Sequence, residues 1–251
     1  MEILMLLTCW STKGGAGTTV VAALLSLQTA RDSTRPTLLV DLCGDLPAAF
    51  GNPEPESGLA DWLNGDLNSS SLQRTLQELT DNLSLLPRGS GQLNPRRTDA
   101  LLEWLSSGAP PTSGAPPNKS VASEPLVVVD AGTWLANSYN KPQAASDNPQ
   151  QQHDLPTQLI CGANRSILVT RACYLSLRKA VKLPFRPTGV VLVAEAGRAL
   201  TRLDCERAIG APVIATVAID PDIARAVDAG MLRTRVPKKA MRALSELTQG
   251  N

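Results

Sequence analysis

Short apolar runs alternate with amphipathic segments along most of this chain. Parallel strands buried on both faces are apolar throughout, and such runs predict strands at 3–9, 36–40, 83–87, 126–129, 166–169, 190–193 and 213–217. Helical spacing predicts helices at about 18–30, 58–63, 72–79, 98–105, 174–182, 199–209, 222–229 and 238–247. The alternation predicts an α/β fold, with a single doubly wound, mostly parallel sheet that carries helices on both faces.

Two polar tracts interrupt this alternation. The tract at about 107–124 is rich in Ser, Gly, Ala and Pro, and the one at about 137–157 is rich in Asn, Gln and Pro. Such compositions bury little apolar surface. Because predicted strands resume after each tract, we expect surface insertions within one domain over residues 1–251.

A glycine-rich turn joins the first predicted strand to the first predicted helix. Strand, turn and helix in this order are typical of a phosphate-binding loop, whose backbone N–H groups surround a polyanion. Of the usual G-x-x-x-x-G-K-[ST] pattern, Gly17 and Thr19 are present, whereas Thr12 replaces the first glycine and Thr18 the lysine. A lysine stands instead at Lys13. The alternative is a turn without a ligand, and the surrounding elements favour nucleotide.

The composition argues against several classes of function. The chain has 251 residues, a formal net charge of +1 and 3% aromatic residues, which argues against a base-stacking platform for single-stranded nucleic acid. Its five cysteines have no metal-ligand spacing and suit reduced thiols, so we expect a cytoplasmic protein. No apolar run approaches the roughly 18 residues that span a bilayer.

The segment from Lys13 to Thr19, Lys-Gly-Gly-Ala-Gly-Thr-Thr, resembles the K-G-G-x-G-K-[ST] loop of the ParA/MinD family of deviant Walker A ATPases. Further segments resemble the family in the same order, and they lie at 37–41, 44–51, 58–65, 85–89, 127–132 and 210–217. The segment around Asp45 and the absent second loop lysine are similar to the CpaE/TadZ-like branch.

The resemblance implies a P-loop NTPase fold, with ATP and Mg²⁺ as cofactors. It implies that Lys13 reaches across an ATP-bound homodimer to the partner's phosphates and that Lys13 and Asp41 are the catalytic residues. The nucleotide-binding residues that it implies are Lys13, Gly14, Gly15, Ala16, Gly17, Thr18 and Thr19. The metal-binding residues that it implies are Thr19, Asp41 and Asp130.

Three positions depart from the family pattern. Thr18 replaces the lysine that neutralises the β- and γ-phosphates, and Cys43 replaces the second switch aspartate, which positions the attacking water. Asp45, two residues further on, is the candidate substitute. Val193 stands where an asparagine often reads adenine. Whether this chain hydrolyses ATP therefore stays open.

Two functions follow. The first is an ATP-dependent dimerising switch that positions a cargo such as DNA, a division site or a pilus or secretion complex. The second is a catalytically impaired, nucleotide-gated scaffold. A protein cargo or adaptor is the expected partner. Basic residues near the C-terminus leave non-specific DNA contact open. The short segment 238–244 lacks aromatic residues, so we expect no direct membrane contact.

Overall fold

The computed structural model describes residues 5–32, 35–66, 68–107, 125–134 and 154–247. The strands in these ranges are β1 (Met5–Ser11), β2 (Thr37–Asp41), β3 (Gln77–Thr80), β4 (Leu83–Leu86), β5 (Leu126–Thr133), β6 (Arg165–Arg171), β7 (Gly189–Ala194) and β8 (Val213–Ala218). They form one sheet in the order β3-β4-β2-β5-β1-β6-β7-β8. Neighbours run parallel except β3 and β4, which are antiparallel. The predicted fold class is confirmed.

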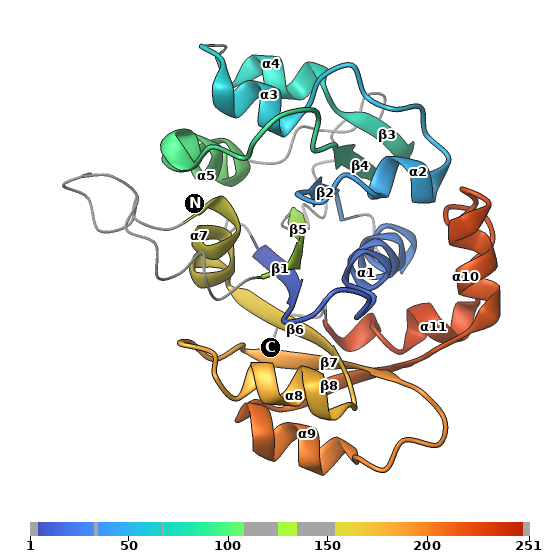
Figure 1. Cartoon of the computed structure of the whole chain (residues 1–251). Helices are drawn as coiled ribbons and strands as arrows, with labels where there is room; N and C mark the ends of the chain where they lie inside the picture. The colour runs from blue at the N-terminus through green and yellow to red at the C-terminus, as the bar shows by residue number, and fades with distance from the viewer. Residues whose placement is uncertain (1–4, 33–34, 67, 108–124, 135–153, 248–251) are drawn as a thin grey trace.

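Helices cover both faces of the sheet (Figure 1). The helices of the described ranges are α1 (Thr18–Asp32), α2 (Leu46–Phe50), α3 (Leu59–Asn64), α4 (Ser70–Arg74), α5 (Thr98–Ser106), α7 (Leu155–Gly162), α8 (Tyr174–Ala180), α9 (Arg202–Ile209), α10 (Pro221–Asp228) and α11 (Lys238–Arg242). Helices α1, α10 and α11 share one apolar cluster, whereas α5, α7, α8 and α9 share the cluster of the opposite face. The sheet therefore separates two cores.

The central strand β1 illustrates why its sequence is apolar at nearly every position. Leu7 and Cys9 pack into the core on the α1 side, and Leu6 and Trp10 pack into the core on the other side. Successive side chains of a strand point to opposite faces, so a strand between two helical layers needs apolar residues at both parities. Trp10 also donates a hydrogen bond from Nε1 to Ser166 Oγ at 2.9 Å, which satisfies its buried polar atom.

One predicted helix is wrong. Residues 72–79 do not form a helix, because α4 ends at Arg74 and Gln77–Thr80 is strand β3. This strand turns at Asp81 and Asn82 and pairs antiparallel with β4. Leu79 is 3% exposed in the α1-side core. Pairing with a neighbouring strand thus overrides the helical spacing of the leucines.

Other boundaries differ from the predictions. Helix α7 was not predicted, and Asp154 caps it by accepting a hydrogen bond from the backbone N–H of Thr157 at 3.0 Å. The closing helix ends at Arg242, and a 3₁₀ turn follows at Ser245–Leu247. Strand β5 continues to Thr133, so it carries Asp130 inside the sheet.

The predicted insertions fall almost wholly outside the described residues, which exclude 108–124 and 135–153. Their character as surface insertions stays a prediction. Among the described helices, none has the length and apolar character needed to cross a bilayer.

Candidate functional site

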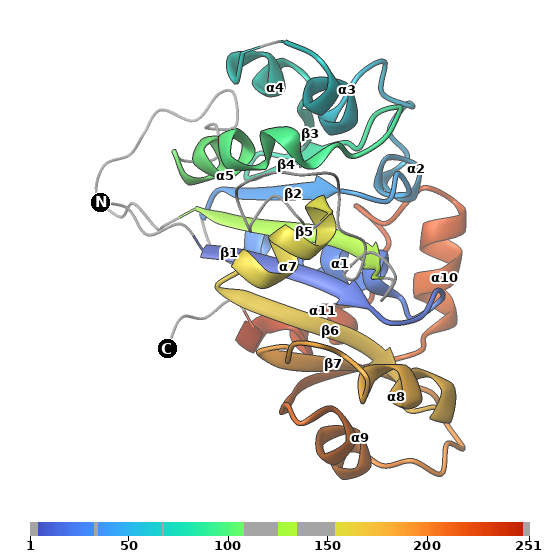
Figure 2. The same cartoon turned by 60° about the vertical axis from the view of Figure 1, so that its left-hand side comes forward.

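The loop between β1 and α1, here called the glycine loop (residues 12–17), lies at the edge where the parallel strands end, here called the carboxyl edge (Figure 2). Gly15 and Gly17 have φ angles of 74° and 91°, which residues with a side chain rarely adopt. The carbonyl of Gly17 accepts the first hydrogen bond of α1, from Val21 N at 2.9 Å. The backbone therefore curls over the start of α1 as the sequence predicts.

Hydrogen bonds hold the glycine loop against two neighbouring elements. The Ser11 hydroxyl donates to backbone carbonyls: its Oγ lies 3.1 Å from the carbonyl oxygen of Lys13 and 3.2 Å from that of Gly132. Ser11 O accepts from the backbone N–H of Trp134 at 2.8 Å, and Thr12 Oγ1 donates to the carbonyl of Ser176 at 3.4 Å. The end of β5 and the start of α8 thus fix the loop on both sides.

Lys13 is exposed, and in the described part of the chain its ammonium forms no salt bridge. Its charge acts on Cys173, which precedes α8. Burial raises the pKa of Cys173, but hydrogen bonds with Ser176 and the nearby charges of Lys13 and Arg198 lower it on balance. Lys13 is therefore a solvent-facing cation that is available to an anion or to a second subunit.

Thr18 and Thr19 begin α1 and differ in their surroundings. Thr18, at the position of the absent lysine, is 6% exposed, whereas Thr19 is only partly buried. The Thr19 hydroxyl interacts with the carboxyl of Asp130 and lowers its pKa. Thr19 and Asp130, both predicted as metal-binding residues, therefore lie together.

Asp41 ends β2 and is fully buried. Its Oδ1 accepts backbone hydrogen bonds from Cys43 and Gly44, both at 2.8 Å, and its Oδ2 accepts one from Leu46 at 3.1 Å. Burial raises the pKa of Asp41, these bonds oppose the rise, and the charge of Asp45 adds to it. Asp41 thereby folds the segment 42–46 and fixes the start of α2.

Asp130 lies beside Asp41, because the two residues are register partners on β5 and β2. Its Oδ1 accepts from the backbone N–H of Gly132 at 3.1 Å. Its Oδ2 is buried and accepts no hydrogen bond from the described residues. Burial raises the pKa of Asp130 to about 7, and nearby Asp41 and Asp45 contribute to the rise. A buried oxygen without a hydrogen-bond partner costs free energy.

Cys43 completes this group. Its Sγ lies 3.8 Å from the carbonyl oxygen of Asp130. Partial burial raises the pKa of the thiol, and the neighbouring carboxylates raise it further, with Asp130 first among them. A Cβ on Gly132, whose φ is 59°, would lie 2.3 Å from Cys43 Sγ, so only glycine permits this approach. The raised pKa keeps the thiol protonated and neutral, so it does not supply the negative charge of a carboxylate.

Asp45 is exposed and makes no side-chain cap on α2. Its charge nonetheless raises the pKa values of Asp41, Cys43 and Asp130, so it lies within electrostatic reach of them. Its role as a substitute for the absent switch aspartate stays a prediction.

The sequence analysis did not select Arg171, which ends β6 and is the register partner of Val193. A Cβ on Gly17 would lie 3.8 Å from Val193 Cγ2, so the glycine loop lies close to this strand end. By strand parity Arg171 shares a face with Ile167 and Val169, which pack on the α1 side. Its Nε is buried without a partner in the described part of the chain. The sequence feature that could have indicated Arg171 is a basic residue at the end of an apolar strand.

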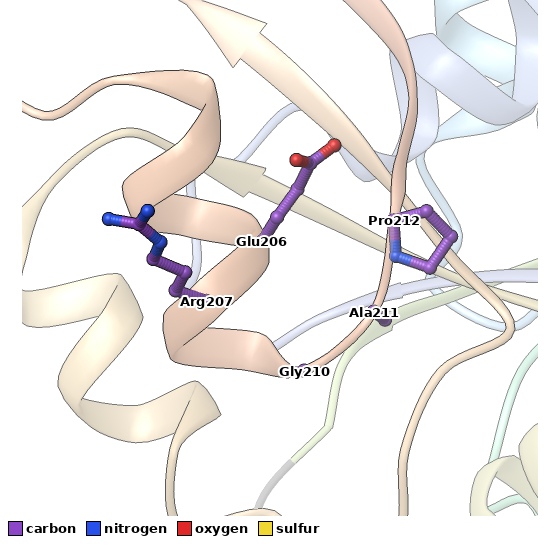
Figure 3. A pocket seen from close by; sticks show the side chains of 5 residues that line it. All are labelled: Glu206, Arg207, Gly210, Ala211 and Pro212. Atoms are coloured by element: carbon purple, nitrogen blue, oxygen red, sulfur yellow. The ribbon is translucent and has the colours of Figure 1, made fainter.

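A shallow surface pocket lies elsewhere. It is lined by Glu206, Arg207, Gly210, Ala211 and Pro212 (Figure 3). These residues follow α9 and precede β8, so the pocket lies at the edge where the parallel strands begin. None of the predicted site residues lines it.

No protein-family model and no curated protein matches this sequence. Solved structures do match it along almost its whole length. A ParA family ATPase from Chlorobium tepidum has 19% identity, a TM-score of 0.70 and 98% coverage of both chains. The septum site-determining protein MinD from Pyrococcus horikoshii, complexed with Mg-ADP, has 20% identity, a TM-score of 0.69 and coverage of 98% of this chain and 96% of that one.

MinD from Aquifex aeolicus, solved as a MinC:MinD cell division protein complex, has 17% identity, a TM-score of 0.69 and coverage of 98% of this chain and 93% of that one. At this identity the comparisons establish the fold alone. The chain has the fold of the ParA and MinD ATPases.

Proposed function

We propose that this chain is a nucleotide-gated switch of the ParA/MinD type, which dimerises around ATP to position a cellular cargo. Two observations on the same edge of the sheet carry the proposal: Lys13 on the glycine loop is exposed and forms no salt bridge among the described residues, and Asp130 Oδ2 is buried without a hydrogen-bond partner among them. The first is a free cation for phosphate, and the second is a carboxyl oxygen that a metal ion can bind. An ATP–Mg²⁺ complex supplies both complementary charges.

The residues present fit these cofactors in part. The N–H groups of the glycine loop and the start of α1 would hold the phosphates. Thr19 and Asp130 would hold Mg²⁺ directly or through water, with Asp41 bracing the segment beside them. The metal ion would neutralise charge on the β- and γ-phosphates.

Weak hydrolysis is part of the proposal. Thr18 supplies no charge to the phosphates, and the loss of one such donor costs about 2–4 kcal/mol of transition-state stabilisation by analogy with an oxyanion hole. Cys43, with its raised pKa, is a neutral thiol where a water-positioning carboxylate is expected. Both features favour a scaffold that responds to ATP binding over an efficient ATPase. The cargo is proposed to be a protein partner or adaptor.

The test measures mass by light scattering after size-exclusion chromatography, with and without Mg²⁺-ATP. We expect a monomer without nucleotide and a dimer with it. Lys13→Ala should abolish the dimer and weaken ATP binding by about tenfold or more, because a charge-assisted contact is lost. Lys239→Ala is the matched control, because Lys239 is also exposed but lies on α11, which contacts Arg31 at the end of α1 opposite the glycine loop.

Phosphate release under the same conditions separates the two candidate functions. Turnover below that expected of slow ATPases, with dimerisation intact, supports the scaffold. Sustained turnover that Lys13→Ala abolishes supports the enzyme. An unchanged elution volume with ATP bound would remove the dimerising switch from consideration.

A further inference from the structure

Strands β2 and β5 lie side by side (Figure 2), and their register pairs Asp41, the last residue of β2, with Asp130 of β5. Three potential ligand groups meet at this point of the carboxyl edge. One oxygen each from Asp41 and Asp130 and the sulfur of Cys43 all lie within 4.8 Å of one another. A tetrahedral ion of the zinc type requires ligand atoms about 3.3–3.6 Å apart. Small side-chain rotations would close this gap, and Cys43 has room to make them because it reaches solvent.

Both carboxylates keep acceptor capacity that hydrogen bonds within the described chain do not use. Asp41 Oδ2 accepts a single hydrogen bond, which leaves one of its lone pairs free. Asp130 Oδ2 has no hydrogen-bond partner among the described residues, although Asp130 is fully buried. Two buried carboxylates with unused acceptor lone pairs are stabilised by a bound cation.

No side-chain cation occupies this place in the described chain. Arg88 is the positive group that acts on Cys43. Its guanidinium instead donates to the carbonyls of Gly89, at 3.3 Å, and Gly91, at 2.8 Å, on its own strand end. Lys13 acts on Cys173, on the other side of the glycine loop.

Sulfur changes which cation suits the site. Carboxylate and water oxygens suit Mg²⁺, whereas a thiolate selects softer ions such as Zn²⁺. Cys43 Sγ lies 3.8 Å from the carbonyl oxygen of Asp130, so the sulfur faces the strand that carries this carboxylate. We propose that Cys43, Asp41 and Asp130 form a binding site for a thiophilic divalent cation of the Zn²⁺ class. When the ion binds, a metal–sulfur bond forms, the S–H bond breaks, and the proton passes to solvent.

The site goes beyond the proposed function, because it uses the cysteine that the proposed nucleotide chemistry leaves idle. It also predicts a consequence for that chemistry. A thiophilic ion bound to Asp130 would occupy an oxygen that the Mg²⁺ of Mg²⁺-ATP is proposed to need. Zinc would thus oppose nucleotide binding at the same edge of the sheet.

The probe is Co²⁺, added without nucleotide to the purified 251-residue protein. We expect one equivalent to produce a near-ultraviolet thiolate-to-cobalt charge-transfer band. Zn²⁺ should abolish the band by displacement, since it binds such sites more tightly, and an excess of Mg²⁺ should not. Because nucleotide is absent, the outcome does not depend on whether the chain binds ATP.

Variants separate the cluster from an isolated thiol. Cys43→Ser should remove the band, while Cys161→Ser, the matched exposed cysteine outside the cluster, should keep it. Asp130→Asn should weaken Co²⁺ binding by about tenfold or more, because a lost ligand of this kind is costly. A wild-type protein without the band, a band that survives in Cys43→Ser, or a folded Asp130→Asn variant with unchanged affinity would each overturn the site.

Discussion

At the scale of single residues, the positive charge of the usual loop lysine is absent from its own position in the glycine-loop motif. The position of the usual loop lysine is taken by Thr18, which is buried at the start of α1. Positive charge instead lies nearby in Lys13 and in Arg171, whose Nε has no partner among the described residues. The substitution at Thr18 and the presence of Lys13 are visible in the sequence. The place of Arg171 near Gly17 requires the pairing of β6 with β7 and the approach of Val193 to the loop.

We predict that Arg171 partly replaces the missing charge. Arg171→Ala should weaken ATP binding, because a phosphate or ribose contact of a charged group contributes about 1.5–3 kcal/mol. Thr18→Lys should strengthen ATP binding by a similar amount. In the double variant the loss caused by Arg171→Ala should shrink, since the restored lysine already supplies the charge.

Isothermal calorimetry on the four proteins of this double-mutant cycle gives the coupling energy. Thermal unfolding of each protein must first establish that the fold is intact, because Thr18 is buried. Strict additivity of the two changes would mean that Arg171 and the loop position serve different parts of the ligand.

At the scale of elements, close backbone approaches decide how helices meet the strand ends. A Cβ on Gly58, just before α3, would lie 2.4 Å from the carbonyl oxygen of Pro87 at the end of β4. Leu59 N and Ala60 N donate to the carbonyls of Pro87 and Arg88 there, at 2.9 and 2.7 Å. The sequence predicted α3 and β4 separately, but it could not predict that one is docked on the other.

The contact between α2 and α10 offers a test of such packing. Gly51 has a φ of 72°, and a Cβ there would lie 2.4 Å from the carbonyl oxygen of Gly230. Gly51→Ala should therefore lower the free energy of unfolding by about 1–3 kcal/mol through strain and overpacking together. Chemical denaturation measures this change.

Gly197→Ala is the matched control for that change. Gly197 has a φ of 80°, but an added Cβ would meet no atom within 4 Å. The variant isolates the conformational cost, which should be about 1 kcal/mol. Equal losses in the two variants would mean that the contact between Gly51 and Gly230 contributes nothing.

At the scale of the whole molecule, parallel strands give the sheet two chemically different edges. The glycine loop, Asp41, Asp130 and Arg171 come from four strand ends and meet at the carboxyl edge. The surface pocket beside Arg207 lies at the opposite edge, where β8 begins (Figure 3). Ligands of open α/β sheets bind outside the carboxyl ends of the strands.

This polarity predicts a negative result. Arg207→Ala removes an exposed charge from the pocket at the opposite edge and should leave ATP affinity unchanged within the error of calorimetry. Lys13→Ala, which also removes one exposed charge, should weaken it. A fall in affinity for Arg207→Ala comparable to that of Lys13→Ala would move the nucleotide site away from the carboxyl edge.

The sequence by itself determined the alternation of strands and helices, the fold class and the loop at the start of α1, because periodicity and glycine placement are local properties. It also indicated Asp41 and Asp130 as strand-end acids. It could not assign 77–80 to a strand, because the antiparallel pairing with β4 decided that. Only the tertiary structure left Asp130 Oδ2 without a partner and placed Cys43 Sγ beside the carbonyl oxygen of Asp130, since these facts depend on β2 and β5 lying side by side. Contacts between segments distant in sequence follow from packing, and they decide which side chains lie beside the glycine loop.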